Sequence, residues 1–375
     1  MNRITLNQLS HSIVSNIIYR LIRLLTGSLF VTLLVFSVTG CVAQQRFLLA
    51  LSKADHTLAI VDVGTLKVMA RVPVGSDPHE VITSSDGKTA YVSIYGGGSL
   101  HEINVIDLVA QKPLFNIDTK PFFGPHGLTF VGGKLWFTAE GSKCVGRYDP
   151  ATKKIDWCMG TGQDRTHMIY VTPDQKKVYT TNVSSGTVSM LVDSPLPPGA
   201  GPMGPPPPGG QQQRPMGPPP GAQPHSQWMQ TAIPVSKGSE GFDVSPDGRQ
   251  LWTASANDGS IAIIDVAKGK VTATIDAKVL GANRLQFTPD GKQVLISSLG
   301  TGDLYVFDVA SHKEVKRIPI GHGGAGILID PDGSRAFVGC TPDNYVAVID
   351  LKKLEMTGHI NVGGGPDGLA WAARN

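Results

Sequence analysis

A unit of about 43 residues recurs along most of the chain, and a repeat of this length restricts the fold more than any other sequence feature. Each copy has an apolar stretch, a turn of the Pro-Asp-Gly-Lys type, a second stretch, a third that ends in Asp, and a fourth. The third stretches end at seven aspartates, 42–45 residues apart except for one interval of 72: Asp62, Asp107, Asp149, Asp193, Asp265, Asp308 and Asp350. Four short strands per repeat are typical of one β-propeller blade. We therefore predict an all-β fold, a single seven-bladed β-propeller of four-stranded antiparallel blades over residues 46–375.

The two ends of the repeat region complement each other. Residues 46–52 have the pattern of a second strand that no first strand precedes, and residues 368–372 that of a first strand that nothing follows. Pairing the two segments completes blade 1 and leaves no open sheet edge. We therefore expect the C-terminal strand to close the ring.

The long interval is explained by an insertion within blade 4. Residues 194–227 are nearly all Pro, Gly, Gln and Met, with runs such as Pro205-Pro206-Pro207-Pro208. Such a segment cannot bury a core, so we predict an extended or disordered insertion. It follows a third strand and should leave the propeller on the face opposite the channel mouth. Either it is a tolerated surface loop, or it is bound by a partner that recognises polyproline helices.

The first 40 residues have the pattern of an export signal. Residues 1–23 are polar and basic, and residues 24–38 are mostly apolar but shorter than the about 20 residues that span a membrane. The segment ends in Val38-Thr39-Gly40-Cys41, which resembles the lipobox of bacterial lipoproteins. We predict a signal peptide over residues 1–40, lipidation of Cys41, and export to the periplasm or anchoring at the outer membrane. Ordinary cleavage near Ala43 and an uncleaved anchor are the alternatives.

The charge distribution excludes one class of partner. Residues 1–40 carry three arginines and no acid, so removing them lowers the formal net charge from +3 to zero. No cluster of Lys and Arg remains, and nucleic-acid-binding proteins depend on one. We predict no nucleic-acid partner, and membrane contact only through the lipid anchor or the signal.

The other cysteines, Cys144, Cys158 and Cys340, form no Cys-x-x-Cys motif. This excludes a zinc ribbon and covalently attached haem. Cys144 and Cys158 flank a predicted hairpin turn, in which pairing Asp149 with Lys154 places Val145 opposite Cys158. A disulfide between Cys144 and Cys158, which an oxidising compartment permits, and two free thiols both agree with this arrangement.

The candidate site lies where the innermost strands open onto one face of the ring. The first strand of each blade lines the central channel, so equivalent positions of the repeat converge there. The first position at the mouth is polar in all but one blade: His79, His126, His167, Glu240, Asn283, Ala325 and Asp367. The next position holds Glu80, Gly127, Met168, Gly241, Arg284, Gly326 and Gly368, and we expect these glycines to mark a close approach of the backbone.

These residue types support metal chemistry. Imidazoles from three adjacent blades are suited to hold one divalent transition metal, so His79, His126 and His167 are the candidate ligands. Glu240 is a candidate catalytic base or fourth ligand, and Arg284 a candidate catalytic cation that holds an anion. The candidate ligand-binding residues are Glu80, Asn283 and Asp367.

Two further features lie on the same face. Residues 95–99, Tyr-Gly-Gly-Gly-Ser, form a long loop that is a candidate lid over the mouth. His56 and His101 lie in loops of this face and are either additions to the site or solvated side chains.

The repeat resembles a known propeller family. The second-strand pattern occurs as Tyr91-Val92-Ser93 after Asp86-Gly87-Lys88, and the fourth-strand pattern as Arg71-Val72-Pro73-Val74-Gly75. These motifs resemble the YVTN β-propeller repeat of bacterial cell-envelope proteins, over residues 46–375 apart from the insertion. The resemblance implies the fold. It does not fix an activity, because such propellers include enzymes, electron-transfer subunits and binding modules.

Three functions are open from the sequence. The first is an envelope propeller that binds a small ligand, a metal or a protein partner at its channel mouth. The second is a metal-dependent hydrolase, lyase or oxidoreductase that uses the three-histidine cluster. The third is a non-catalytic scaffold recognised through its rim or its Pro-rich insertion. The first two differ in whether the three imidazoles converge on one point.

Overall fold

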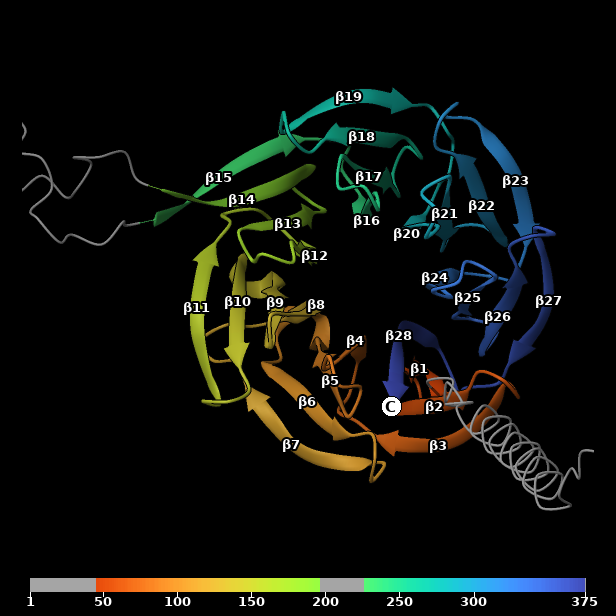
Figure 1. Ribbon diagram of the computed structural model, residues 1–375, viewed down its shortest axis with the longest axis horizontal. Coiled ribbons are helices and arrows are strands. Elements are labelled where there is room, and N and C mark those ends of the chain that lie inside the picture. Colours follow the sequence, from red (N-terminus) through yellow and green to blue (C-terminus); the bar gives the residue numbers. More distant parts are fainter. Residues whose placement is uncertain (1–44, 196–225, 375) are drawn as a thin grey trace, which may run out of the picture. The chain divides into compact units, whose positions relative to one another are not determined.

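The computed structural model describes residues 45–195 and 226–374. These residues form 28 strands, which make seven four-stranded antiparallel sheets arranged in a ring (Figure 1). The predicted all-β, seven-bladed propeller is confirmed. The first strands of neighbouring blades contact one another around the central channel.

The strands of the first blades follow the chain around the ring. Blade 1 contains β28 (Pro366–Arg374), β1 (Gln45–Ser52), β2 (Thr57–Asp62) and β3 (Lys67–Pro73). Blade 2 contains β4 (Pro78–Thr83), β5 (Thr89–Ile94), β6 (Glu102–Asp107) and β7 (Lys112–Asp118), with the 3₁₀ turn η1 (Gly96–Gly98) after β5. Blade 3 contains β8 (Pro125–Val131), β9 (Lys134–Ala139), β10 (Cys144–Asp149) and β11 (Lys154–Gly160), with η2 (Glu140–Ser142) after β9.

The remaining blades repeat the same order. Blade 4 contains β12 (Thr166–Val171), β13 (Lys177–Asn182), β14 (Thr187–Pro195) and β15 (Ser226–Pro234). Blade 5 contains β16 (Ser239–Val244), β17 (Gln250–Ser255), β18 (Ile261–Asp265) and β19 (Lys270–Ile275). Blade 6 contains β20 (Ala282–Phe287), β21 (Gln293–Ser298), β22 (Asp303–Asp308) and β23 (Glu314–Pro319), and blade 7 contains β24 (Gly324–Ile329), β25 (Arg335–Cys340), β26 (Tyr345–Asp350) and β27 (Glu355–Ile360).

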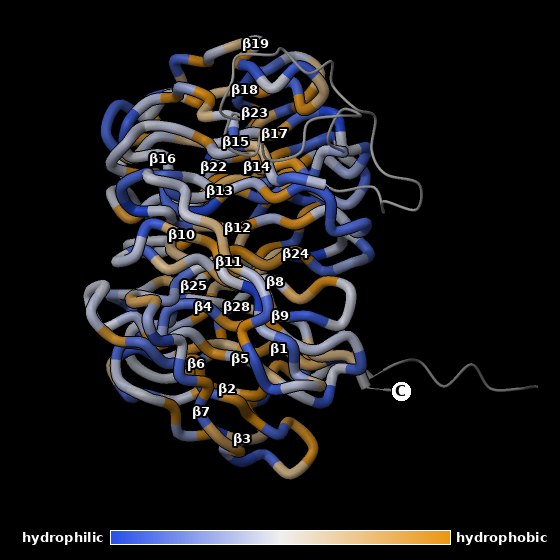
Figure 2. The backbone as a smooth tube through the Cα atoms, turned by 90° about the vertical axis from the view of Figure 1, so that its left-hand side faces the viewer, coloured by the Kyte–Doolittle hydropathy of each residue, from blue (hydrophilic) through white to orange (hydrophobic). Residues whose placement is uncertain are grey.

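The hydrophobic core lies between neighbouring sheets. Trp252 of blade 5 and Phe287 of blade 6 share one cluster, with their ring centroids 5.8 Å apart. Hydrophobic stretches run along the strands, and hydrophilic residues gather in the turns at both faces (Figure 2). Second and third strands are buried on both sides, which explains their nearly continuous apolar sequences.

The repeated aspartates fix the turns on the face away from the channel mouth. Asp86 accepts a hydrogen bond from the backbone N–H of Lys88 in the first turn of blade 2. Asp107, at the end of the third strand, accepts from the N–H groups of Val109 and Ala110. An Asp that binds the N–H two or three residues later stabilises a tight turn, so the repeat motif encodes the hairpins directly.

The C-terminal strand closes the ring as predicted. β28 pairs with β1, with Leu48 opposite Trp371. An ion pair reinforces the closure, because Arg46 of β1 contacts the buried carboxylate of Asp330 in blade 7 at 2.5 Å. Arg335 contacts the same carboxylate at 2.8 Å.

Several predictions fall wholly or partly outside the described residues. The signal peptide over residues 1–40, Cys41, and residues 196–225 of the insertion lie there. The insertion is narrower than predicted, because Ser194 and Pro195 extend β14 and pair with Gln227 and Ser226 of β15. In the described ranges, no helix has the length and apolarity needed to cross a membrane.

The disulfide considered between Cys144 and Cys158 is not formed. Both residues are free thiols, Cys144 buried and Cys158 exposed. A bulge between Arg147 and Tyr148 shifts the register, so Cys158 lies opposite Gly146 rather than Val145.

Candidate functional site

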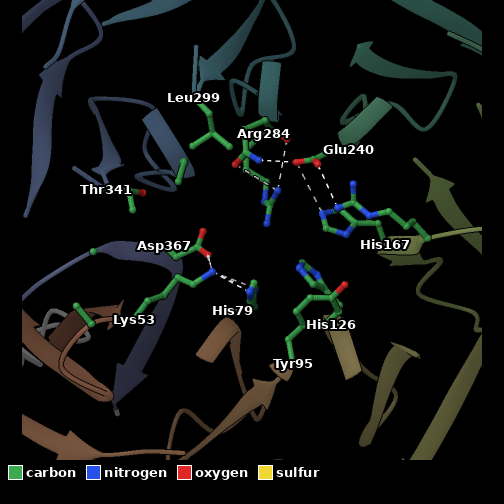
Figure 3. A pocket seen from close by; sticks show the side chains of 15 residues that line it. Lys53, His79, Tyr95, His126, His167, Glu240, Arg284, Leu299, Thr341 and Asp367 are labelled. Atoms are coloured by element: carbon green, nitrogen blue, oxygen red, sulfur yellow. Dashed lines mark hydrogen bonds and ion pairs between the residues drawn. The ribbon is translucent and has the colours of Figure 1, made fainter. Parts of the chain in front are cut away.

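A cavity of about 530 Å³ opens at the channel mouth. All seven residues predicted for the first position of the inner strands line it: His79, His126, His167, Glu240, Asn283, Ala325 and Asp367. Arg284 lines it as well, whereas Glu80 lies beside it as the ion-pair partner of Arg284. The repeat positions therefore converge as expected (Figure 3).

In four of the inner strands, the residue that follows the mouth residue is glycine, and this allows the strands to converge. A Cβ on Gly127 would lie 2.5 Å from the carbonyl oxygen of His167, and one on Gly241 2.5 Å from that of Asn283. A Cβ on Gly326 would likewise clash with the carbonyl oxygen of Asp367, and one on Gly368 with that of His79. Each of these glycines thus makes room for the mouth residue of the next blade.

Two buried imidazoles stand side by side in the cavity. His126 and His167 are each 3% exposed, and their ring centroids are 3.9 Å apart. Nδ1 of His126 and Nε2 of His167 are buried and have no hydrogen-bond partner among the described residues. An unpartnered buried ring nitrogen is costly, and two at one place are the donor set that a transition metal would satisfy.

Glu140 fixes the tautomer of His167. Its buried carboxylate accepts a hydrogen bond from Nδ1 of His167 and one of 2.5 Å from the hydroxyl of Tyr95. A carboxylate can only accept, so the proton of a neutral His167 is on Nδ1 and the lone pair of Nε2 faces the cavity. Burial acts to raise the pKa of Glu140, but the bond from His167, the bond from Tyr95 and the charge of Arg165 lower it below its ordinary value.

His126, Glu140 and His167 form a compact group, with one ligand atom of each within 4.8 Å of the other two. Both oxygens of Glu140 already accept hydrogen bonds, so its role is to orient His167. Carboxylates commonly hold metal-binding histidines in this way. Burial, followed by the neighbouring positive charges, lowers the pKa of His126 well below its ordinary value and keeps its ring neutral.

Glu240 lies on the cavity side of His167. Its Oε2 is 4.0 Å from Nε2 of His167 and accepts a hydrogen bond of 2.6 Å from the amide of Asn283. Arg165 contacts the other carboxylate oxygen at 3.3 Å. Glu240 is more exposed than Glu140, so it is the carboxylate that a metal or a bound molecule in the cavity can reach.

His79 is not part of the compact group. Its Nε2 is 2.7 Å from Nζ of Lys53 and 3.1 Å from Asp77. Burial lowers the pKa of His79 to about 4, with Lys53 and Arg284 acting in the same direction and Asp367 and Asp77 opposing them. The ring of His79 lies next to that of His126, with the centroids 4.8 Å apart, so the three predicted imidazoles stand in a row. The Nε2 of His79 is nevertheless occupied by Lys53 and Asp77.

Arg284 and Glu80 form an ion pair across the channel, from blade 6 to blade 2. Burial acts to lower the pKa of Arg284, but the carboxylates of Glu80, Asp367 and Glu240 raise it. The guanidinium is therefore permanently charged and points toward the middle of the cavity (Figure 3).

The charged residues that line the cavity are three cations, Lys53, Arg165 and Arg284, and two carboxylates, Glu240 and Asp367. Three further carboxylates lie outside the lining and pair with these cations: Asp77 with Lys53, Glu140 with Arg165 and Glu80 with Arg284.

A second repeat position contributes residues that the sequence analysis did not name as site residues, although it included Tyr95 in the candidate lid. The residue directly after the second strand is Lys53, Tyr95, Glu140, Leu299 or Thr341 in five of the blades. Four of these line the cavity, and Glu140 holds His167. Aligning this position across the repeats, as was done for the inner strands, is the signal that would have found them.

The predicted lid is anchored. A Cβ on Gly124 would lie 2.8 Å from Cα of Gly98 and 3.1 Å from the nitrogen of Gly141, so the loop around η1 packs tightly against blade 3. Tyr95, at the start of this loop, donates a hydrogen bond to Glu140. His56 and His101 do not line the cavity, and His101 instead contacts Asp118 at 2.9 Å.

Comparisons with known proteins agree with the propeller class. Residues 219–334, less than half of the chain, match the family model of the cytochrome D1 heme domain. No curated protein matches the sequence. The class that fold and site define is a β-propeller with a polar, histidine-containing channel mouth.

Solved structures extend the likeness over most of the chain. A candidate 6-phosphogluconolactonase from Bacteroides fragilis aligns with a TM-score of 0.66 and 15% identity, covering 89% of this chain and 99% of that one. Hydrazine synthase of Kuenenia stuttgartiensis aligns with a TM-score of 0.59 and 18% identity, covering 78% and 89%. The dihydro-heme d1 dehydrogenase NirN in complex with DHE aligns with a TM-score of 0.56 and 15% identity, covering 84% and 63%. At such identities the likeness shows the fold alone.

Proposed function

We propose that this propeller binds one divalent transition-metal ion at its channel mouth, with His126 and His167 as ligands. The observation that carries the proposal is the pair of buried ring nitrogens without partners beside the oriented tautomer of His167. When bound, the ion supplies a Lewis-acidic centre with positions open to a small ligand in the cavity.

A haem-type ligand is the class to which the names of the matched family and of NirN point. Five of the fifteen residues that line the cavity are charged, namely Lys53, Arg165, Glu240, Arg284 and Asp367. Cofactor pockets are usually lined predominantly by hydrophobic and aromatic side chains. The matched segment also contains neither His126 nor His167. We therefore assign the ion to the side chains themselves.

Catalysis is the second candidate function, and Glu240 favours it. Its carboxylate is partly exposed, lies 4.0 Å from the metal-facing nitrogen of His167, and is held by Asn283 and Arg165. A carboxylate in this place is suited to take a proton from a molecule bound to the ion. A hydrolase, a lyase and an oxidoreductase all agree with this geometry.

Two further proposals concern the cellular location of the protein and the family of its propeller repeat. We propose an exported protein of the bacterial envelope, supported by the basic and apolar segment that ends at Cys41. We also propose that the blades belong to the YVTN type, supported by the motifs around Tyr91 and Val72.

Elemental analysis of the purified protein tests the metal proposal. We expect about one ion per chain after incubation with Zn²⁺, Cu²⁺ or Fe²⁺ and gel filtration, and less than a tenth of that in His126→Ala/His167→Ala. The matched control, His79→Ala, should retain the ion because His79 lies outside the compact group. A parent chain without metal contradicts the proposal, and a stoichiometric rise in Soret absorbance on haem titration would favour the macrocycle instead.

A further inference from the structure

A second cavity lies on the opposite face of the ring, between blades 4 and 5. It has a volume of about 350 Å³, within the range of ligand-binding pockets. Its floor and walls combine two aromatic rings with apolar side chains: Tyr170, Tyr179, Pro173, Val244 and Val266. The centroids of the two tyrosine rings are 6.3 Å apart. We call this cavity the tyrosine groove.

One polar group in the tyrosine groove has no partner. The hydroxyl of Tyr179 is buried and makes no hydrogen bond within the described residues, and Tyr179 is 1% exposed. Burial raises the pKa of Tyr179 to about 12, so the hydroxyl carries its proton and is available as a donor. The hydroxyl of Tyr179 therefore lacks an acceptor, which a bound molecule would supply.

The Pro-rich insertion begins and ends next to this groove. Lys177, which lines the groove, pairs with Val192 of β14, and β14 ends only three residues later, at Pro195. The chain returns at Ser226, which pairs with Pro195. The about 30 residues between them are more than enough to reach the groove, since an extended polyproline chain advances about 3.1 Å per residue.

The chemistry of the segment matches the groove. Proline has no N–H, so the carbonyl groups of a proline run remain free acceptors. Grooves lined by aromatic rings bind such runs through ring contacts and donors aimed at those carbonyls. The charged residues that line the groove, Asp174 and Lys177, balance each other, and Arg214 is the single Lys, Arg, Asp or Glu residue between 196 and 225, so the match rests on the ring contacts and the Tyr179 donor. We propose that the tyrosine groove binds the Pro-rich segment of the same chain, with the hydroxyl of Tyr179 donating to a prolyl carbonyl.

Competition with a peptide tests this proposal. The probe is a labelled synthetic peptide copied from residues 203–220, titrated against the intact chain and against a variant with a Gly-Ser linker in place of residues 198–223. We expect binding to the shortened variant and at least tenfold weaker binding to the intact chain, because the tethered segment competes at high effective concentration. Tyr179→Phe in the shortened variant should weaken binding at least fivefold, and Tyr148→Phe, a buried tyrosine of blade 3, should not change it.

Three outcomes would overturn the proposal: no peptide binding, equal binding to the intact and shortened chains, or equal effects of the two tyrosine variants. Equal binding to both chains would show that the groove is open to a separate proline-rich partner. If the shortened variant does not fold, proteinase K digestion of the intact chain tests whether the Pro-rich segment is bound in the groove. Tyr179→Phe should speed cleavage within residues 196–225 at least threefold over the parent and Tyr148→Phe, and an unchanged rate contradicts self-docking.

Discussion

At the scale of single residues, the site depends on groups that orient one another. His167 contributes its free lone pair only because Glu140 binds the opposite ring nitrogen, and Tyr95 in turn holds Glu140. The sequence predicted His126, His167 and Glu240 from one repeat position. It did not reveal Glu140, the first residue of η2, because only the inner-strand positions were aligned across the repeats and not the position after the second strand.

The role of Glu140 gives the first prediction. Glu140→Gln replaces one acceptor oxygen by an amide that can donate to Nδ1 of His167, which favours the tautomer with its proton on Nε2. We expect metal affinity to fall about 10- to 100-fold, measured by competition with a chromophoric chelator. Glu102→Gln, near the outer edge of blade 2, is the control. An unchanged affinity for Glu140→Gln would mean that the tautomer is set by another group.

His79 gives a prediction for acid stability. Its pKa of about 4 in the folded chain lies below the ordinary 6.5, so the unfolded state binds more protons between these pH values. The free energy of unfolding should therefore fall as pH decreases from 6.5 to 4, by about 3 kcal/mol from this group alone. Denaturant titrations of metal-free His79→Gln and parent protein should show a shallower decline for the variant. If the unfolding free energies of both proteins fall equally with pH, burial does not lower the pKa of His79 as described.

At the scale of elements, the inner strands are packed so closely that glycine is required. The periodicity of the repeat predicted the hairpins and their order, because Asp-capped turns and apolar strands are local features. It did not predict the pairing register between the third and fourth strands of a blade. A bulge interrupts this pairing in blades 1, 2, 3, 5, 6 and 7. A bulge adds one residue to one strand without a distinct sequence mark, which is why Cys158 was placed opposite the wrong residue.

Gly241→Ala tests the close packing. The added methyl group would lie 2.5 Å from the carbonyl oxygen of Asn283, and backbone must move to relieve the clash. We expect a loss of about 2–4 kcal/mol in unfolding free energy, measured by denaturant titration, together with weaker metal binding as Glu240 shifts. Gly160→Ala, which meets no atom within 4 Å, is the matched control. Similar stabilities of the two variants would show that the inner strands can spread without cost.

At the scale of the whole molecule, ring closure joins residues that lie almost a chain length apart. β28 and β1 share a sheet, and Arg46 reaches Asp330 of the last blade. The complementary chain ends made this closure predictable from sequence. The ion pair was not predictable, because it joins blades that only the closed ring brings together.

Asp330→Asn tests the closure. The change removes a carboxylate that is 1% exposed and that pairs with both Arg46 and Arg335, and leaves Arg46 only the carboxylate of Asp332 at 4.0 Å. We expect a loss of about 3 kcal/mol in the free energy of unfolding. Calorimetry should show a lower Tm, whereas Glu355→Gln, which removes an exposed ion pair with Lys353, should change it little. A similar Tm for both variants would mean that strand pairing alone holds the ring closed.

The most direct test of the central claim is anomalous X-ray diffraction from crystals of the protein soaked in Zn²⁺. The account predicts one dominant peak at the channel mouth, about 2.0–2.1 Å from Nε2 of His167 and from a ring nitrogen of His126, while Nδ1 of His167 stays bonded to Glu140. A peak elsewhere, or no peak in crystals whose cavity is open to solvent, would contradict a metal site at this mouth.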